Sequence, residues 1–345
     1  MRFFLLFFVM AFHIAVSGQR HYVCYFATHP PVIDGVGEEA AWQAAPWTAD
    51  FGDIEGEIRP RPEFRTRTKM LWDKDYLYIY AELEEPDLWG TLRQHDTIVY
   101  LDNDFEVFID PDNDTHNYFE LEFNALNTEM DLFLAKPYRN GGRALMSWDA
   151  QGLRSAVHTR GTLNHPGDKD AGWSVEMAIP LKTLHFWGDG PVRDSAVWRI
   201  NFSRVEWDRE VKDGQYVVLT DGATGRRRPE HNWVWSPQGI IDMHAPEKWG
   251  YLQFSERSGG RDTVAFVPPV DEKARELLWK VYYGQRDFHR SRGRYATSLQ
   301  DLGLPPAPEG YSLKMEAMEV QYTAVVMDPG GMLMIDQDGR IGRLR

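Results

Sequence analysis

The sequence is poor in cysteine, with Cys24 as the single example among 345 residues. A disulfide within the chain is therefore excluded, and the fold must be held by its hydrophobic core. Cys24 also lacks the small residues that precede a lipid-modified cysteine. We interpret it as a small buried hydrophobic residue rather than as the site of a lipid anchor.

Positive charge is also scarce. The chain has 38 Lys and Arg against 52 Asp and Glu, which gives a net charge of −14. Nucleic acid and anionic membrane surfaces both need a basic face on their partner, so neither is expected to bind this chain. A neutral oligosaccharide or polysaccharide imposes no such requirement and remains open as a partner.

Catalytic signatures are missing as well. The sequence contains no GxSxG, no P-loop, no HExxH and no Cys–His pair within a motif, and its histidines have no zinc-binding spacing. Hydrolysis of glycosidic bonds needs only two suitably separated carboxylates, for which Glu106 with Glu122 or Glu176 are candidates. A glycoside hydrolase-like enzyme of carbohydrate breakdown therefore stays open as an interpretation.

One long hydrophobic run is present, from Phe3 to Val16, preceded by Arg2 and followed by small residues at Ser17 and Gly18. It is too short for a comfortable membrane span, and no stop-transfer pattern follows it. The run predicts a signal peptide over residues 1–18 with cleavage before Gln19. We expect an exported protein, periplasmic, on the cell surface or secreted, with no stable membrane span after cleavage.

The body of the chain shows repeated alternation of apolar and polar residues, which is typical of β-strands with one buried face. Aromatic residues make up 13% of the chain and hydrophobic residues 43%, enough for a packed core. These patterns predict an antiparallel β-sandwich or jelly roll. The segments with this pattern are Lys69–Leu83, Phe105–Ile109, Phe119–Phe123, Trp173–Ile179, Trp198–Phe202 and Trp249–Phe254.

The C-terminal part has a different pattern. A polar, glycine-bearing stretch at Ser255–Asp262 is typical of a linker, and a helical stripe begins after Pro269 and ends before Gly293. Strand-like runs with hairpin turns follow, the first of them predicted as Leu313–Met327. We therefore predict a sandwich over residues 19–255, a linker over 256–268 and an α+β extension of unknown role, a helix with a small hairpin, over 269–345.

Several phrases occur in a fixed order along the body of the chain. They are Pro31–Gly35 followed by Trp42, then Leu71–Tyr78, Phe105–Asp110, Glu122–Asn127, Gly172–Pro180 and Lys248–Gly250. This ordered set resembles the family 9 carbohydrate-binding modules over roughly residues 25 to 255. The resemblance implies a β-sandwich that binds sugar and works beside a glycoside hydrolase, rather than one that cuts sugar.

The resemblance also implies where the ligand lies. Family members hold a sugar between two tryptophans; Tyr100 stands near the first position, and Met243 or His244 must replace the second. A sugar-binding glutamate of the family matches Glu106, and a sugar-contacting arginine aligns near Glu122, which reverses the charge. Period-two alternation adds Glu122 and Asn124 to the same polar face as candidate ligand-binding residues.

Two further expectations accompany this interpretation. No cofactor is required. The structural calcium of some family members and the alternating carboxylates of Asp110, Asp112 and Asp114 make a Ca²⁺ site an option. An EF-hand is excluded, because Thr115 stands at position six of the loop, where Gly is needed, and Leu121 at position twelve, where Glu is needed. The missing tryptophans leave a second interpretation open, in which the chain is a structural or assembly protein that keeps the sandwich and has lost its sugar. That interpretation predicts a filled site.

Overall fold

The structure is a computed structural model that describes residues 19–185, 190–260 and 263–344. The signal peptide predicted for residues 1–18 lies outside this part of the chain. Within it, no helix is both long enough and apolar enough to cross a membrane.

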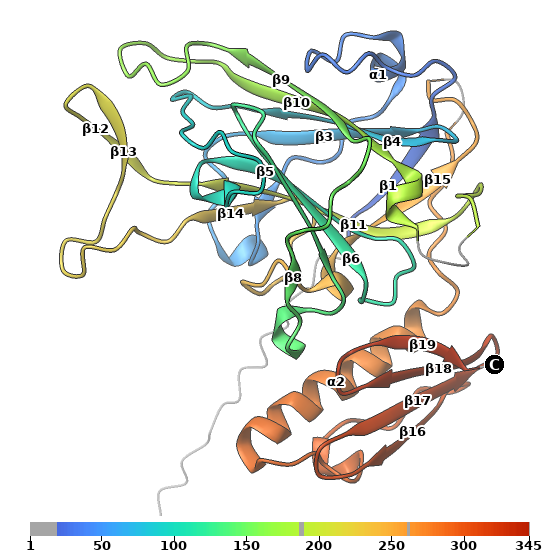
Figure 1. Ribbon diagram of the computed structural model, residues 1–345. Coiled ribbons are helices and arrows are strands. Elements are labelled where there is room, and N and C mark those ends of the chain that lie inside the picture. The colour runs from blue at the N-terminus through green and yellow to red at the C-terminus, as the bar shows by residue number, and fades with distance from the viewer. Residues whose placement is uncertain (1–18, 186–189, 261–262, 345) are drawn as a thin grey trace, which may run out of the picture.

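The larger part of the molecule is one 13-stranded sheet that folds over on itself (Figure 1). Eleven strands follow the order β8-β7-β6-β5-β11-β15-β1-β3-β4-β10-β9, and β14 and β2 join beside β11. The strands on this path are β1 His21–Phe26, β3 Thr66–Trp72, β4 Tyr76–Leu83, β5 Asp104–Asp110, β6 Tyr118–Asn124, β7 Glu129–Leu134, β8 Ala144–Leu145, β9 Arg154–Arg160, β10 Gly172–Pro180, β11 Val197–Glu206 and β15 Gly250–Ser255, with β2 Gly52–Asp53 and β14 His231–Val234 beside it.

The main core lies between the two halves of this folded sheet. One half contributes the alternating apolar residues of β5, β6 and β11, and the other contributes those of β3, β4 and β10. Alternation places every second side chain of a strand on the same face, so each strand buries one row of residues in this core. The mainly β sandwich predicted from the sequence is therefore confirmed. The row from β10 consists of Trp173, Val175, Met177 and Ile179.

The two halves are joined through β1, which follows the predicted cleavage site. His21 to Tyr25 pair in parallel with Tyr251 to Ser255 of β15, while Tyr25 and Phe26 pair in parallel with β3. Every other pairing among the named strands of this sheet is antiparallel. Cys24 lies in β1 and is fully buried, as expected for a small hydrophobic residue.

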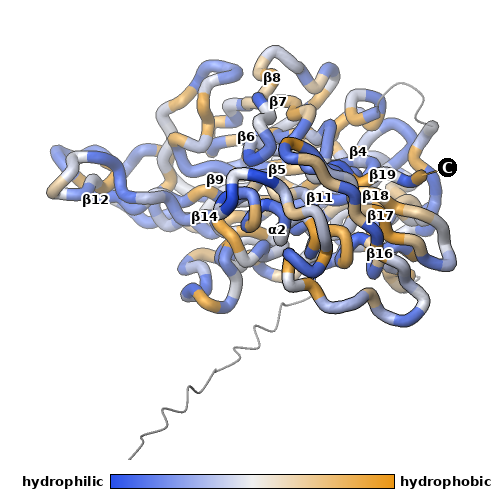
Figure 2. The backbone as a smooth tube through the Cα atoms, turned by 90° about the horizontal axis from the view of Figure 1, so that it is seen from below, coloured by the Kyte–Doolittle hydropathy of each residue, from blue (hydrophilic) through white to orange (hydrophobic). Residues whose placement is uncertain are grey.

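Two smaller elements lie on the periphery of the sandwich. The short helix α1, Ala40–Ala44, buries Trp42 behind β4. The hairpin of β12, Arg209–Lys212, and β13, Gln215–Val218, projects away from the sandwich as an arm in which β12 is largely hydrophilic (Figures 1 and 2).

The C-terminal extension folds into two layers of its own, a helix and a sheet. Helix α2, Glu272–Arg292, packs on a four-stranded antiparallel sheet made of β16 Ser312–Ala317, β17 Tyr322–Asp328, β18 Gly331–Asp336 and β19 Ile341–Leu344. The helix ends at Gly293, whose φ of 71° closes the last turn in the left-handed conformation. The single run predicted over Leu313–Met327 is wrong, because a turn before Tyr322 divides it into β16 and β17.

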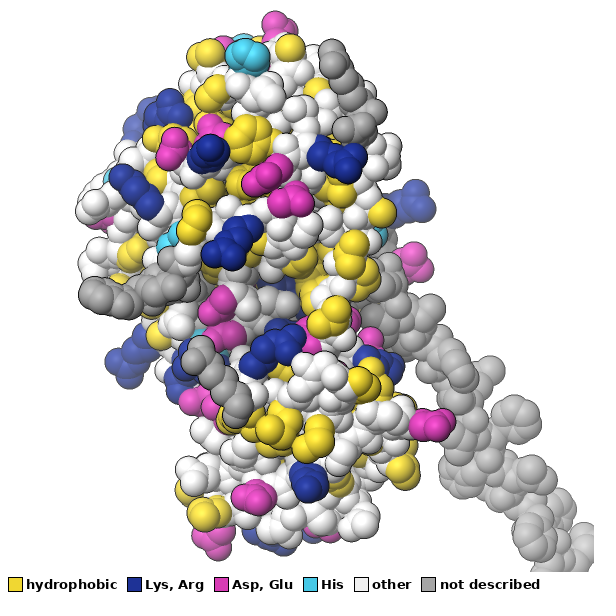
Figure 3. Space-filling view, turned by 90° about the vertical axis from the view of Figure 1, so that its right-hand side faces the viewer, with side chains coloured by type: hydrophobic (Ala, Val, Ile, Leu, Met, Phe, Trp, Pro, Cys, Tyr) yellow, Lys and Arg dark blue, Asp and Glu magenta, His cyan; other side chains and the backbone are white. Residues whose placement is uncertain are grey.

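The extension is tied to the sandwich by polar contacts. Arg340 pairs with Asp114 at 3.0 Å, the Thr115 hydroxyl donates to the Gly339 carbonyl at 2.8 Å, and Arg275 donates to the Asn113 carbonyl at 2.6 Å. Figure 3 shows charged side chains of both signs where the extension meets the sandwich. We call this polar contact region the seam.

Candidate functional site

The outer face of β5 and β6, turned away from the main core, carries an unusual set of side chains. Glu106 and Phe108 of β5 stand directly opposite Glu122 and Glu120 of β6. All four are at most 5% exposed. The face is therefore covered by other parts of the chain rather than solvated like an ordinary outer strand face.

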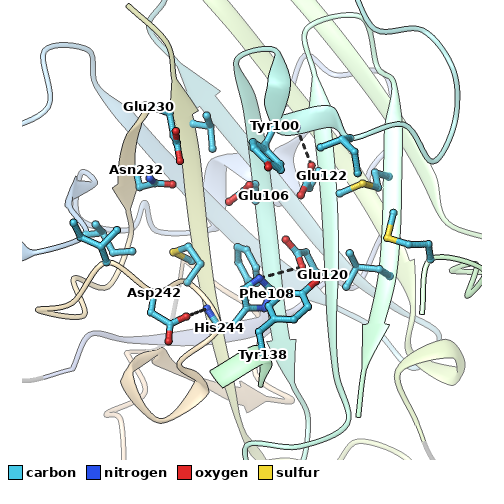
Figure 4. Close-up of a pocket in the computed structure, with 18 residues that line it drawn as sticks. Tyr100, Glu106, Phe108, Glu120, Glu122, Tyr138, Glu230, Asn232, Asp242 and His244 are labelled. Carbon is cyan, nitrogen blue, oxygen red and sulfur yellow. Dashed lines mark hydrogen bonds and ion pairs between the residues drawn. The ribbon is translucent and has the colours of Figure 1, made fainter. Parts of the chain in front are cut away.

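Loops from distant parts of the sequence cover this face and leave a cavity of about 430 Å³ above it (Figure 4). Tyr100 comes from the turn before β5, and Tyr138 from the turn after β7. The segment Asp242–His244 comes from the stretch before β15. In Figure 4 Glu106 and Glu122 lie side by side next to Tyr100, and Glu120 lies further along β6 toward Tyr138; we call these three glutamates the glutamate row.

The structure brings together five of the six residues predicted for the ligand site. Tyr100, Glu106, Glu122, Met243 and His244 all line the cavity. Tyr100 is 39% exposed and so offers part of its ring to a ligand. Its backbone N–H donates to Glu122 at 3.0 Å, which fixes the two residues relative to each other.

Asn124 is placed elsewhere. It is fully buried at the end of β6 and does not line the cavity. Its side-chain oxygen accepts the N–H groups of Leu126 and Thr128, and its amide donates to Leu92 and Asp102. Strand alternation put Asn124 on the correct face, but the turn that follows uses its whole hydrogen-bonding capacity.

The cavity contains polar residues that the sequence interpretation did not include. They are Glu120, Tyr138, Glu230, Asn232 and Asp242. Glu120 carried a usable signal, because it belongs to the same alternation as Glu122. The other four lie on loops or on β14, where local sequence pattern says nothing about which face of the sandwich a residue reaches.

Burial dominates the electrostatics of the glutamate row. It raises the pKa of Glu106 to about 7, with the charge of Glu230 adding to the effect, although the nearby Ser203 hydroxyl acts to lower this pKa. Burial and then Glu106 raise the pKa of Glu120 to about 8, and the same two causes raise that of Glu122 well above its usual range. The row therefore retains protons at neutral pH until a ligand offers compensating charge or hydrogen bonds.

The segment that replaces the second tryptophan is firmly held. His244 Nδ1 lies 3.1 Å from the Tyr118 hydroxyl, and the Tyr138 ring packs edge-on against His244 with centroids 4.4 Å apart. The indole of Trp249 donates to the Met243 carbonyl at 2.8 Å. Burial, followed by the charge of Arg139, lowers the pKa of His244 to about 3, so its ring is neutral in solution.

Arg139 connects this segment to the extension. It donates to the His244 carbonyl at 3.1 Å, to Glu247 at 2.7 Å and to the Tyr282 hydroxyl of α2 at 3.2 Å. Tyr283 of α2 also donates to Glu247. The extension thus contacts the segment at one wall of the cavity through Arg139 and through Tyr283.

The aspartate turn considered for calcium lies outside the cavity. Asp110, Asp112 and Asp114 present oxygen atoms within 4.8 Å of one another. However, both oxygens of Asp110 accept backbone N–H groups, and Asp114 accepts the His116 N–H and pairs with Arg340. These donors already satisfy the turn, so the residues fit a calcium ion poorly.

A comparison with protein-family models matches residues 33–215 to the family described as carbohydrate family 9 binding domain-like. The match spans more than half of the chain and includes β5, β6 and the three glutamates on them. The chain belongs to this family. The resemblance inferred from the ordered phrases is therefore confirmed, although no curated protein matches the chain.

A comparison with solved structures also finds similar proteins. A protein from Bacteroides uniformis described as carbohydrate-binding is 16% identical, covers 69% of this chain and 100% of its own, and has a TM-score of 0.50. Two structures of a family 9 module from Caldicellulosiruptor kristjanssonii, with cellotriose and with glucose, are each 16% identical. They cover 72% and 70% of this chain and all of their own, with TM-scores of 0.46 and 0.44. At this identity the Bacteroides structure supports the sandwich fold alone.

Proposed function

We propose that the chain binds a carbohydrate in the cavity above β5 and β6 and does so as a family 9-like binding module. One observation supports this most strongly. Tyr100 and Glu106, six residues apart in the sequence, and the distant Met243–His244 segment line a single cavity in a member of a carbohydrate-binding family.

The chemistry of the cavity suits a sugar ring. A ring presents a flat CH face, which packs on an aromatic side chain such as Tyr100, and a rim of hydroxyls, which donate to carboxylates. A volume of about 430 Å³ leaves room for a small saccharide. A structural protein that had lost its ligand was expected to have a filled site, and the open cavity counts against that interpretation.

The proposal extends to the setting of the protein. An export signal over residues 1–18 would deliver the module outside the cytoplasm, where polysaccharides are found. There it would hold its glycan beside a glycoside hydrolase. Retention of residues 1–18 in the mature protein, read by mass spectrometry of the expressed chain, would contradict cleavage before Gln19.

A glycan array followed by calorimetry tests the binding proposal. We expect Tyr100→Ala and Glu106→Gln each to weaken binding about tenfold or more, since each removes a stacking surface or a charge-assisted hydrogen bond. Glu210→Gln, which changes an exposed glutamate on the projecting β12–β13 arm, is the control that leaves binding unchanged. A folded chain that binds nothing on a broad array would refute the proposal.

Glycoside hydrolysis is a second candidate, favoured by one observation. Glu106 and Glu122 face each other with oxygens within 4.8 Å, and burial raises the pKa of each. A close carboxyl pair with one protonated member is the arrangement of retaining glycosidases. New reducing ends released from oligosaccharides by the chain, and lost in Glu122→Gln, would favour this candidate over binding alone.

A further inference from the structure

The cavity carries an excess of acidic side chains. Glu106, Glu120, Glu122 and Glu230 line it, and no Lys or Arg is among its described lining residues. The fifth acid, Asp242, lies 3.7 Å from Arg139, whereas none of the four glutamates forms an ion pair with a described Lys or Arg. Hydroxyls of a neutral sugar need only one or two carboxylates as acceptors, so four acidic side chains without a cationic partner exceed what a purely neutral ligand requires.

The arrangement of the glutamates costs stability. Glu106 and Glu122 occupy directly opposed positions on paired strands, where like charges repel and destabilise the sheet. Asp104 lies two residues before Glu106 on the same face of β5, and its carboxylate is a third one within 4.8 Å of this pair. An unfavourable cluster of this kind is expected where a ligand supplies the missing positive charge.

Groups within the protein do not supply that charge. Among the described residues that line the cavity, His244 is the one basic side chain, and its ring is neutral because of its burial and of Arg139. Its Nε2 is 3.8 Å from Glu120, beyond hydrogen-bonding distance. One oxygen of Glu120, which is 5% exposed, has no hydrogen-bond partner.

The aromatic side chains indicate what kind of cation fits. Tyr100 lies beside Glu106 and Glu122 and Tyr138 lies on the side of Glu120, and the two tyrosines are 39% and 45% exposed (Figure 4). A ring-shaped ligand packs its CH face on such side chains, and an ammonium group is attracted both to their π faces and to carboxylates. The acidic side chains and the exposed tyrosines together therefore favour a ligand that has both an ammonium group and a ring with a flat CH face.

Resting on the proposed carbohydrate function, we propose that the ligand is an amino sugar whose free ammonium group lies among Glu106, Glu120 and Glu122 while its ring packs against Tyr100. A bare divalent cation is the competing occupant. It would use the oxygens of Asp104, Glu106 and Glu122 but would leave both tyrosines without a partner. The amino sugar uses the carboxylates and the aromatic ends together.

Calorimetry with three matched trisaccharides tests the inference: the glucosamine trimer with free amines, its N-acetylated form and cellotriose, all at pH 7. We expect the free-amine trimer to bind about tenfold or more tightly than the other two, because a charge-assisted contact is worth at least that factor.

Variants test which side chain causes the preference for the free-amine trimer. Glu120→Gln should remove most of the preference for the free-amine trimer, whereas Glu210→Gln on the β12–β13 arm should keep it. Equal or tighter binding of cellotriose would overturn the amino-sugar inference and leave carbohydrate binding intact. Absence of binding to all three sugars would overturn the amino-sugar inference whether or not calcium chloride binds, and the glycan array would then decide on carbohydrate binding itself; calcium binding that Glu106→Gln abolishes would identify the divalent cation as the occupant.

Discussion

Replacing Glu106 by Gln should stabilise the protein at neutral and alkaline pH. The pKa of this buried carboxyl is raised from 4.5 to about 7, and each pKa unit corresponds to about 1.4 kcal/mol of differential stability, which gives about 3 kcal/mol. Between pH 4.5 and 7 the folded state retains a proton that the unfolded chain has lost. Stability therefore falls as pH rises through this window, and the loss is complete above pH 7.

The Gln variant cannot ionise at this position, so it does not suffer that loss. Urea unfolding at intervals from pH 4.5 to 8.5 should show the two curves diverging by about 3 kcal/mol at the upper end, with the variant more stable. Glu210→Gln, which changes an exposed glutamate, should follow the wild type throughout. Parallel curves for Glu106→Gln and the wild type would refute the view that Glu106 is held in a desolvated, uncompensated site. Loss of ligand binding by the stabilised variant would mark the usual conflict between function and stability.

Three other outcomes follow from the contacts. Arg139→Met leaves Glu247 buried without its ionic partner and should lower the free energy of unfolding by about 3 kcal/mol, measured by urea unfolding. Gly37→Ala should cost about 1–3 kcal/mol in the same assay, since φ is +69° there and the added Cβ would lie 2.5 Å from the Tyr80 ring. EDTA should leave the thermal midpoint unchanged, because the Asp110–Asp114 turn is satisfied by protein donors; a fall of several degrees would contradict this.

Strand positions were largely predictable because alternation is a local property. A strand that buries one face must repeat every two residues, so β5, β6, β10 and β11 stand out in the sequence. The pairing of β1 with β15 and β3 was not predictable from pattern, because nothing in the residues of β1 specifies a parallel partner.

The site was predictable to the extent that it lies on strands. Glu106 and Glu122 follow from alternation and from the family resemblance, whereas Tyr138 and Glu230 reach the cavity through the paths of loops. Asn124 shows the limit of alternation, which gives the face of a residue but not the partners of its side chain. The turn after β6 decided those partners.

The position of β1 has a consequence for the order of folding. The first strand of the sandwich to leave the ribosome pairs along its length with β15, the last strand of the same sheet. Until residues 250–255 have been made, β1 lacks one neighbour and the two halves of the sheet cannot be joined through it. Pairing between strands so far apart in the sequence is slow. The sandwich therefore stays incompletely folded until its synthesis is almost complete.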